Sequence, residues 1–178
     1  MPTMNTGLGG PAGYGENVFS SSTKYTGNDD DGKTLGLEAD VSWLPIDSLE
    51  LFASIGLLNA ELSTGRGQAH APRYTYAVGG EYRHDSGFFA RLDFTGKDEF
   101  YFDFSHDEKS EAYNLANARV GYAADRWTAQ LFARNLFDET YAVRGFFFGN
   151  EPPNFPPTLY IRQGDPRQIG VRFDWSFD

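Results

Sequence analysis

The chain has 178 residues, no cysteine and a formal net charge of −10. The lack of cysteine excludes a disulfide framework and a thiolate metal site, and the acidic balance excludes nucleic acid as a partner, because phosphate binding needs clustered lysine and arginine. No apolar run approaches the roughly 18 residues of a membrane-spanning helix, which excludes a helical membrane protein.

Residues 1–33 are predicted to be loop, because Gly, Asn, Ser and the acidic run Asp29–Asp31 break every period and supply turn chemistry. The start has neither the basic residues nor the apolar segment of a signal peptide, so the chain is expected to be either a fragment or not exported. An eighth strand within residues 13–25 stays an open alternative, since the alternation there is poor.

From Leu35 onward the sequence predicts seven β-strands, because apolar and polar residues alternate with a period of two. Pro45 ends the first strand, and the fourth is open to extension as far as Phe104. With 16% aromatic residues, this pattern predicts an all-β, antiparallel fold. In chain order the strands are Leu35–Trp43, Leu49–Leu58, Tyr74–Arg83, Phe88–Thr95, Ala116–Tyr122, Trp127–Arg134 and Gln168–Phe177.

Short and long connections alternate along the chain. The short ones are residues 45–48, 84–87 and 125–126, and the long ones are residues 63–73, 105–112 and 143–166. Outer-membrane β-barrels have this alternation, with short periplasmic turns and long outer loops.

Aromatic side chains on the apolar faces gather beside the short turns and at the chain end. They predict a girdle at one membrane interface, where rings lie at the depth of the lipid headgroups. The girdle residues are Trp43, Tyr82, Phe88, Tyr122, Trp127, Trp175 and Phe177.

The polar faces carry many charges, whereas the apolar faces of the same segments carry none. A small soluble barrel fills its interior with apolar side chains, so these charges predict a wide, watery lumen with lipid on the other face. The charged positions are Glu38, Asp40, Glu50, Glu81, Arg83, Arg91, Asp93, Arg119, Arg134, Arg172 and Asp174. Seven strands leave two open edges, so we expect the chain to need the remaining strands of a larger barrel.

The long connection 143–166 is the candidate ligand-contact segment, because long loops are disproportionately functional and its rings are expected to be exposed. Packing against neighbouring loops is the alternative interpretation. The candidate residues are Arg144, Phe146, Phe147, Phe148, Tyr160 and Arg162. The sequence has no nucleophile motif and no histidine pair with metal-ligand spacing, so it predicts no catalytic site, no metal site and no cofactor. Arg134 and Asp138 are expected to form an ion pair in the lumen.

Three segments together resemble the TonB-dependent receptor family. In Tyr113–Tyr141 the residues Asn135, Leu136, Phe137, Asp138 and Tyr141 resemble the "NLFD" and tyrosine that end the family's penultimate strand. Gly164–Phe177 is similar to its closing strand, and Gly36–Leu62 is similar to an earlier hairpin. Phe177 corresponds to the terminal aromatic residue that the barrel-assembly machinery reads, here followed by Asp178.

The resemblance implies a segment of a 22-stranded barrel in the outer membrane of a Gram-negative bacterium, with residues 1–33 the remnant of a preceding outer loop and residues 34–178 the C-terminal part of the barrel domain. It implies uptake of a scarce solute, most often a ferric siderophore, with TonB acting through a plug that fills the lumen. Plug and coupling box have no counterpart in this sequence, so we expect the chain alone not to transport. A passive porin-like barrel and a soluble β-rich binding protein remain the alternatives.

Overall fold

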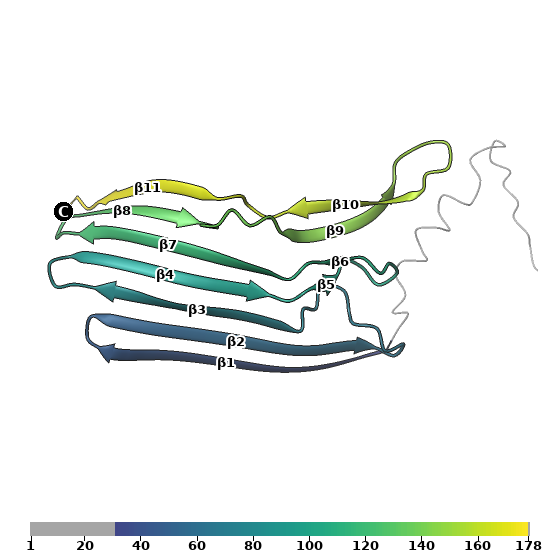
Figure 1. Cartoon of the computed structure of the whole chain (residues 1–178), viewed down its shortest axis with the longest axis horizontal. Helices are drawn as coiled ribbons and strands as arrows, with labels where there is room; N and C mark the ends of the chain where they lie inside the picture. The colour runs from purple at the N-terminus through teal and green to yellow at the C-terminus, as the bar shows by residue number, and fades with distance from the viewer. Residues whose placement is uncertain (1–30, 178) are drawn as a thin grey trace, which may run out of the picture. The chain divides into compact units, whose positions relative to one another are not determined.

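The structure is a computed structural model that describes residues 31–177, and its main element is one antiparallel seven-stranded sheet (Figure 1). The order in the sheet is β1-β2-β3-β4-β7-β8-β11. These strands span Gly32–Ile46, Leu49–Leu62, Tyr74–Arg83, Phe88–Lys97, Tyr113–Ala123, Trp127–Arg134 and Gln168–Trp175. No helix in the described residues is long and apolar enough to cross a membrane.

Two small hairpins lie outside the sheet, in two of the long connections. One pairs β5 (Phe100–Tyr101) with β6 (Lys109–Ser110), and the other pairs β9 (Ala142–Gly149) with β10 (Pro157–Gln163). The second hairpin corrects the prediction of loop throughout residues 143–166.

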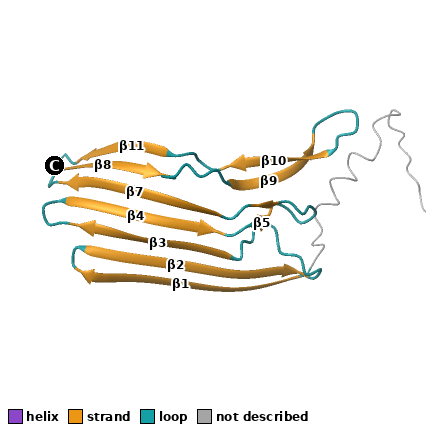
Figure 2. Ribbon diagram, viewed as in Figure 1, coloured by secondary structure: helices purple, strands orange, loops and turns teal. Residues whose placement is uncertain are grey.

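The connections alternate in length as predicted. Turns of residues 47–48, 84–87 and 124–126 lie at one end of the sheet, called here the short-turn end, and the longer connections 63–73, 98–112 and 135–167 lie at the other, the long-loop end (Figure 2). Gly87 adopts a φ of +96° in the second turn, a conformation that only glycine reaches without strain.

The seven predicted sheet strands are confirmed, whereas several of their ends were wrong. β1 begins at Gly32 and continues past Pro45 to Ile46, because a register shift between Trp43 and Ile46 accommodates the missing proline N–H. β4 ends at Lys97 instead of reaching Phe104, and β11 ends at Trp175. The possible strand in residues 13–25 lies outside the described residues.

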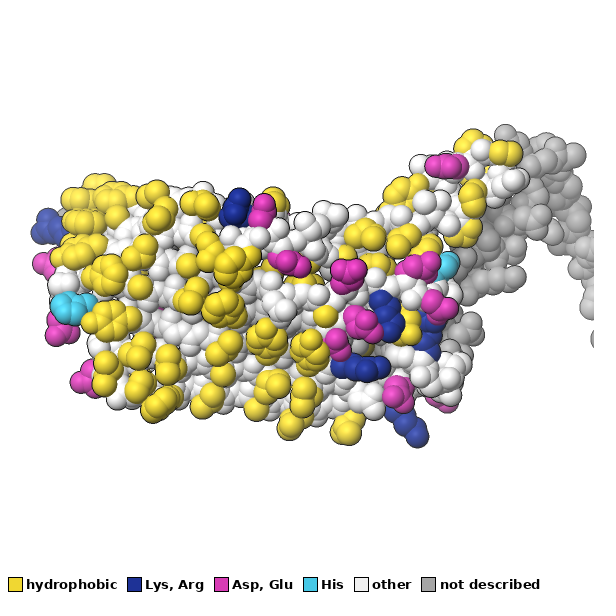
Figure 3. All heavy atoms as spheres, in the orientation of Figure 1, with side chains coloured by type: hydrophobic (Ala, Val, Ile, Leu, Met, Phe, Trp, Pro, Cys, Tyr) yellow, Lys and Arg dark blue, Asp and Glu magenta, His cyan; other side chains and the backbone are white. Residues whose placement is uncertain are grey.

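The predicted alternation places apolar side chains on one face of the sheet, the apolar face. Leu37, Val78, Leu131 and Val171 are 62%, 45%, 51% and 74% exposed, so they do not meet in a dry interior. Figure 3 shows hydrophobic side chains spread across this face over most of the sheet. The sheet therefore has one layer, and no second layer of the described residues covers its apolar face.

The buried apolar side chains of the long connections are Phe100 and Phe102, whereas Ala60, Phe89 and Ala116 are buried within strands of the sheet. Phe100 and Phe102, which follow β4, are both 3% exposed and their rings meet edge to face at 5.9 Å. Their burial explains why β4 ends early, because the chain turns inward to pack these rings. The signal in the sequence was the alternating Phe100, Phe102 and Phe104, which looked like a longer strand.

Candidate functional site

The polar face carries a charge network centred on Glu81, which is only 5% exposed. Backbone register places Glu81 beside Arg91, and Arg91 beside Arg119, across β3, β4 and β7. Arg119 Nη2 lies 2.6 Å and Arg91 Nη1 3.4 Å from Glu81 Oε2, and Arg83 also pairs with this carboxylate. Asp93 extends the network, since it lies 3.2 Å from Arg91 Nε. Five of the eleven charges predicted for a wetted face therefore form one network.

A close contact between an aromatic ring and a glycine positions one arginine of this network. Phe52 on β2 pairs with Gly79 on β3, where an added Cβ would lie 2.5 Å from the Phe52 ring. The Arg91 guanidinium covers the same ring at 4.3 Å from its centroid, a cation–π contact. A larger residue at position 79 would displace the ring and with it the arginine.

Six of the seven predicted girdle residues lie in the strands at their short-turn ends, and Phe177 follows β11. Phe88 faces Tyr122 and Trp127 faces Trp175 in the backbone register. The rings of Tyr122 and Trp127 lie 5.6 Å apart, and those of Trp175 and Phe177 lie 6.3 Å apart. These rings thus contact one another at the short-turn end, both between neighbouring strands and along the chain after β11.

Asn135, the first residue of the "NLFD" sequence, is a buried anchor for the long connection 135–167. It adopts a φ of +47°, and its side-chain amide donates to the Glu139 and Asp165 carbonyls at 2.8 and 3.1 Å. Its amide oxygen accepts from the Glu139 N–H at 2.9 Å. The two ends of the connection are therefore tied to one side chain.

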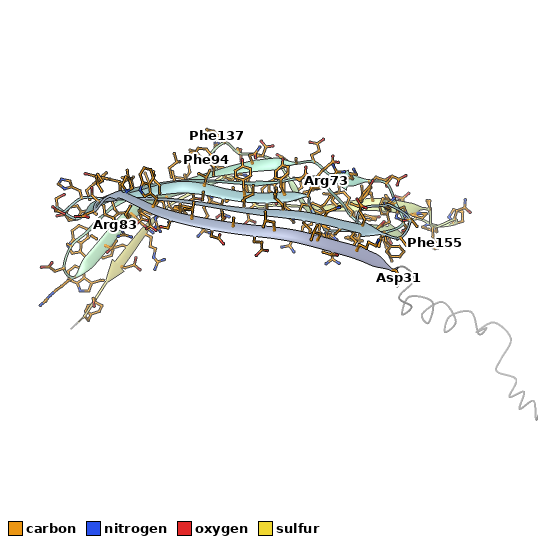
Figure 4. The ribbon with its side chains drawn as sticks, turned by 90° about the horizontal axis from the view of Figure 1, so that it is seen from below. Asp31, Arg73, Arg83, Phe94, Phe137 and Phe155 are labelled. Atoms are coloured by element: carbon orange, nitrogen blue, oxygen red, sulfur yellow. The ribbon has the colours of Figure 1, made fainter. Side chains whose placement is uncertain are left out.

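Asp138 completes this turn and does not form the predicted pair with Arg134. Its carboxylate accepts from the Arg167 N–H at 2.9 Å and lies 3.8 Å from the Arg167 guanidinium. A φ of +59° at Asp138 turns the chain away from the β8 direction, so strand periodicity does not extend to this residue. The exposed ring of Phe137 lies on the same side of the sheet as Phe94, a residue of the apolar face (Figure 4).

Cation–π contacts and an ion pair link two of the long connections. Tyr101 lies under two cations, Arg66 at 4.1 Å and Lys109 at 4.5 Å from the ring centroid. The Lys109 ammonium lies 2.8 Å from Glu99, and this hydrogen bond lowers the pKa of Glu99 and raises that of Lys109. Connections 63–73 and 98–112 are thereby linked.

Asp103 and His106 form a second polar contact in connection 98–112. The Asp103 carboxylate accepts from the backbone N–H groups of Ser105 and His106, at 2.9 and 2.7 Å, and lies 2.7 Å from His106 Nδ1. Partial burial works to raise the pKa of Asp103, but these hydrogen bonds outweigh it and hold the pKa below its usual value.

The hairpin β9–β10 brings five of the six ligand-contact candidates to one face. Alternation along β9 places Arg144, Phe146 and Phe148 on one face. Tyr160 and Arg162 of β10 lie on the same face, because they pair with Phe146 and Arg144 in the backbone register. The rings of Phe146 and Tyr160 stack with centroids 5.6 Å apart. Apart from Tyr160, which is half-buried, these side chains are exposed.

Phe147 lies on the opposite face of the hairpin and, like Tyr160, is only partly exposed. Its ring stacks on His106 with centroids 3.6 Å apart. On the same face an added Cβ at Gly145 would lie 2.5 Å from the Phe102 ring. This face of the hairpin therefore packs against connection 98–112, as the alternative interpretation of the segment expected.

Within residues 31–177 no group of three or more His, Asp and Glu side chains is placed to hold a metal ion. His84 lies in a short turn, whereas His70 and His106 lie in two different long connections. On the polar face, Glu81, Asp93 and Asp174 pair with arginine or asparagine, which favours a structural role for these carboxylates.

The sequence matches the family model described as TonB dependent receptor-like, beta-barrel, over residues 3–136. The fold is similar to that of the ferric yersiniabactin uptake receptor FyuA from Yersinia pestis, at 18% identity over 84% of this chain and 24% of that chain, with a TM-score of 0.69. The siderophore receptor PiuA from Acinetobacter baumannii matches at 16% identity over 81% of this chain and 22% of that chain, with a TM-score of 0.66. FpvA from P. aeruginosa, solved with bound pyoverdines, matches at 18% identity over 83% of this chain and 20% of that chain, with a TM-score of 0.61. The chain thus spans about a quarter or less of the length of these receptors, and identities this low establish a shared fold alone.

Proposed function

Because this chain belongs to the TonB-dependent receptor β-barrel family, we propose that it serves TonB-dependent uptake of a scarce solute, most often a ferric siderophore, across the outer membrane of a Gram-negative bacterium. The predicted family and the predicted all-β barrel segment are confirmed. This is a family of receptors and transporters, and enzymatic activity is no part of the proposal. One structural relative is described as a ferric yersiniabactin uptake receptor, one as a siderophore receptor and one as bound to pyoverdines in an iron complex, which supports the choice of ligand.

The contrast between the two faces of the sheet is the observation that carries the proposal. One face leaves large apolar side chains exposed, whereas the other holds a network of paired charges around Glu81. Lipid acyl chains suit contact with the apolar face, and water suits contact with the charged face. The sheet therefore fits the wall of a wide membrane pore. In this orientation the short turns face the periplasm and the aromatic band, including Trp43, Trp127 and Trp175, lies at the periplasmic interface.

The free edges of β1 and β11 are proposed to pair with further barrel strands. Neither edge has a partner strand in the described sheet, and unpaired backbone groups are costly in hydrocarbon. We propose as partners the remaining strands and the plug of a complete receptor, through which TonB acts, and the barrel-assembly machinery, which reads the region of Phe177.

The exposed face of the hairpin β9–β10 is proposed to contact the ligand at the outer mouth. It lies at the long-loop end, which faces outward in this orientation, and it presents Arg144, Phe146, Phe148, Tyr160 and Arg162 together. Phe147 is proposed to support the site from behind through its stack on His106.

Disruption of the gene in its own bacterium tests the proposal. We expect the protein in the outer-membrane fraction, and we expect the mutant to lose growth on at least one ferric siderophore supplied as sole iron source. Restoration of the gene should restore growth. Recovery of the protein in the soluble fraction, or unchanged growth on every siderophore offered with iron otherwise withheld, would contradict the proposal. Diffusion of unrelated small solutes through the protein without TonB would favour the porin-like alternative.

A further inference from the structure

We propose that the polar face of β7, β8 and β11 carries a docking site for an acidic segment of the plug. The site is a concave, arginine-lined part of the wall, called here the arginine hollow. The inference rests on the proposed function and deepens it, because it gives the charge of the partner segment and the strands against which that segment packs.

The arginine hollow has a volume of about 360 Å³. On its β11 side the Phe132 ring of β8 lies over Gly170, where an added Cβ would lie 2.7 Å from the ring. A ring that lies this low against the sheet leaves space between the longer arginine side chains around it. The residues that line the hollow include Arg91, Asp93, Arg119, Phe132, Arg134 and Arg172.

Positive charge exceeds negative charge in the hollow. Four of its lining residues in the described part of the chain are arginines, whereas Asp93 is the only carboxylate among them. Glu81 and Asp174 lie beside the hollow and pair with two of these arginines. No carboxylate of residues 31–177 lies within ion-pair distance of Arg134, and the buried Nε of Arg119 has no hydrogen-bond partner there. An incoming carboxylate would neutralise the excess charge and accept hydrogen bonds from the planar guanidiniums, which match its geometry.

The opposite side of the polar face carries the opposite charge. Glu38 and Asp40 on β1 and Glu50 on β2 are exposed, and the polar-face positions of these two strands contain no lysine or arginine. The Ser42 hydroxyl donates to Glu50 at 2.9 Å, but no cation of the described residues pairs with Glu38 or Asp40. The polar face is therefore divided into an acidic part on β1 and β2 and the arginine hollow on β7, β8 and β11.

This division favours a folded segment over a small solute as the occupant. In the sheet order β2-β3-β4-β7-β8, β2 and β8 are four strand spacings apart, which is roughly 19 Å along the wall. An occupant that neutralises both parts must be at least as wide, with carboxylates toward β7–β11 and basic side chains toward β1 and β2. The plug is the segment proposed to fill the lumen, so the charge division of the wall would fix the rotational orientation of the plug about the barrel axis.

The complete receptor in the outer membrane of its own bacterium, with substitutions made in the chromosomal gene, tests the proposal. R134E reverses the charge of an arginine that has no ion-pair partner in the sheet, R134Q only removes that charge, and E38K reverses a charge of the acidic part. R126E is the matched control, because Arg126 is an exposed arginine in a short turn outside the hollow. Immunoblots of the outer-membrane fraction give the amount of each variant. Susceptibility to vancomycin, which is too large to cross an intact outer membrane, reports a displaced plug.

We expect R134E and E38K, at native protein levels, to lower the inhibitory concentration of vancomycin by about fourfold or more, because like charges in contact repel one another. R134Q should have a smaller effect in the same direction, and R126E should have none. Native vancomycin resistance in both R134E and R134Q would overturn the inference. Weaker growth on a ferric siderophore without a vancomycin leak would also overturn it, since that result would assign the hollow to the solute in transit.

Photo-crosslinking identifies the partner directly, including the case in which R134E fails to reach the membrane. The photoreactive residue p-benzoylphenylalanine would replace Gln130, which lines the hollow, and its cross-links formed in whole cells would be mapped by mass spectrometry. We expect cross-links to a plug peptide that contains Asp or Glu. Cross-links confined to barrel strands, or none at all, would overturn the inference.

The two phenotypes distinguish this inference from the proposed function. A vancomycin leak in R134E, in a bacterium whose growth on every ferric siderophore is independent of the receptor, would reject the uptake function and retain the docking site. Receptor-dependent growth on a siderophore, with no leak in R134E or R134Q, would reject the docking site alone.

Discussion

The Arg119 guanidinium donates to the Glu81 carboxylate at 2.6 Å, although the two residues are 38 positions apart in the chain. They lie on β7 and β3, and Arg91 on β4 lies between them in the backbone register. The contact forms because the register of the three strands places these residues side by side in one row across the polar face. A single carboxylate thus compensates several guanidiniums that would otherwise repel one another.

Replacement of Glu81 by Gln should destabilise the sheet by about 1–3 kcal/mol, because the surrounding arginines lose the carboxylate that they share. Urea unfolding in detergent micelles, followed by circular dichroism, measures the change. Glu50→Gln is the matched control, since Glu50 lies opposite Glu81 on β2 but is exposed. Equal stability of the two variants would show that the Glu81 network contributes nothing.

Replacement of Asn135 by Ala should loosen the connection 135–167 while the seven-stranded sheet remains folded. The variant loses the side-chain bonds to Glu139 and Asp165 and keeps a φ of +47° that alanine tolerates poorly. We expect faster protease cleavage within the connection and faster amide exchange at Glu139.

Asn135→Gly separates the two causes, because glycine accepts the positive φ but has no amide side chain. Cleavage of the glycine variant at a rate between those of the native chain and the alanine variant would assign part of the effect to each cause. Native resistance to cleavage in both variants would contradict the role of Asn135 as an anchor.

The Asp103 hydrogen bonds should make the order of connection 98–112 depend on pH in the acid range. The pKa of Asp103 is lowered in the folded chain, so its stabilisation is fully present above the ordinary value of 3.8 and is lost as the pH falls through the lower folded value. Amide exchange at Ser105 and His106, measured over this range, should accelerate as Asp103 becomes protonated.

Asp103→Asn is the corresponding control, because its side chain does not titrate. Exchange in this variant should be faster than in the native chain above pH 3.8, and the acid-dependent step assigned to Asp103 should disappear. A native pH profile in the variant would show that another group causes the step.

An arginine in the middle of the β8 apolar row should be poorly tolerated. Leu131→Arg places a charge in hydrocarbon at a cost of about 2–4 kcal/mol near the bilayer midplane, and we expect a lower yield of inserted protein. Gln130→Arg changes the neighbouring residue, which points to the polar face, and should insert normally. The heat-resistant folded fraction on electrophoresis gives the comparison, and equal loss for both variants would contradict the assignment of the faces.

The sheet could be predicted from sequence because the alternation of apolar and polar residues is a local pattern that repeats in each strand. Leu131, for example, lies in a row where every second residue is apolar, and its partners Val120 and Val171 repeat the same parity. Strand ends were less predictable, since they depend on distant contacts. β4 stops where Phe100 and Phe102 turn into the small core at the long-loop end.

The candidate ligand surface could be found from sequence only as a set of residues in one segment. The run Phe146–Phe148 has no alternation, so the sequence did not indicate a strand or show which rings share a face. What separates Phe147 from the rings of the other face is its tertiary contact with His106, and these two residues are 41 positions apart in the sequence. The "NLFD" residues were recognisable by resemblance, whereas the bonds of Asn135 required the structure.

Spin-label quenching from within the bilayer tests the central claim most directly. Single cysteines at positions 37, 78, 131 and 171, each labelled with a fluorophore, would be reconstituted with lipids that carry nitroxides on their acyl chains. Outward orientation of the apolar face predicts strong quenching at all four positions and weak quenching at labels placed on Glu38, Gln130 and Arg172. Weak quenching at positions 37, 78, 131 and 171, with strong quenching at the polar positions, would contradict the account.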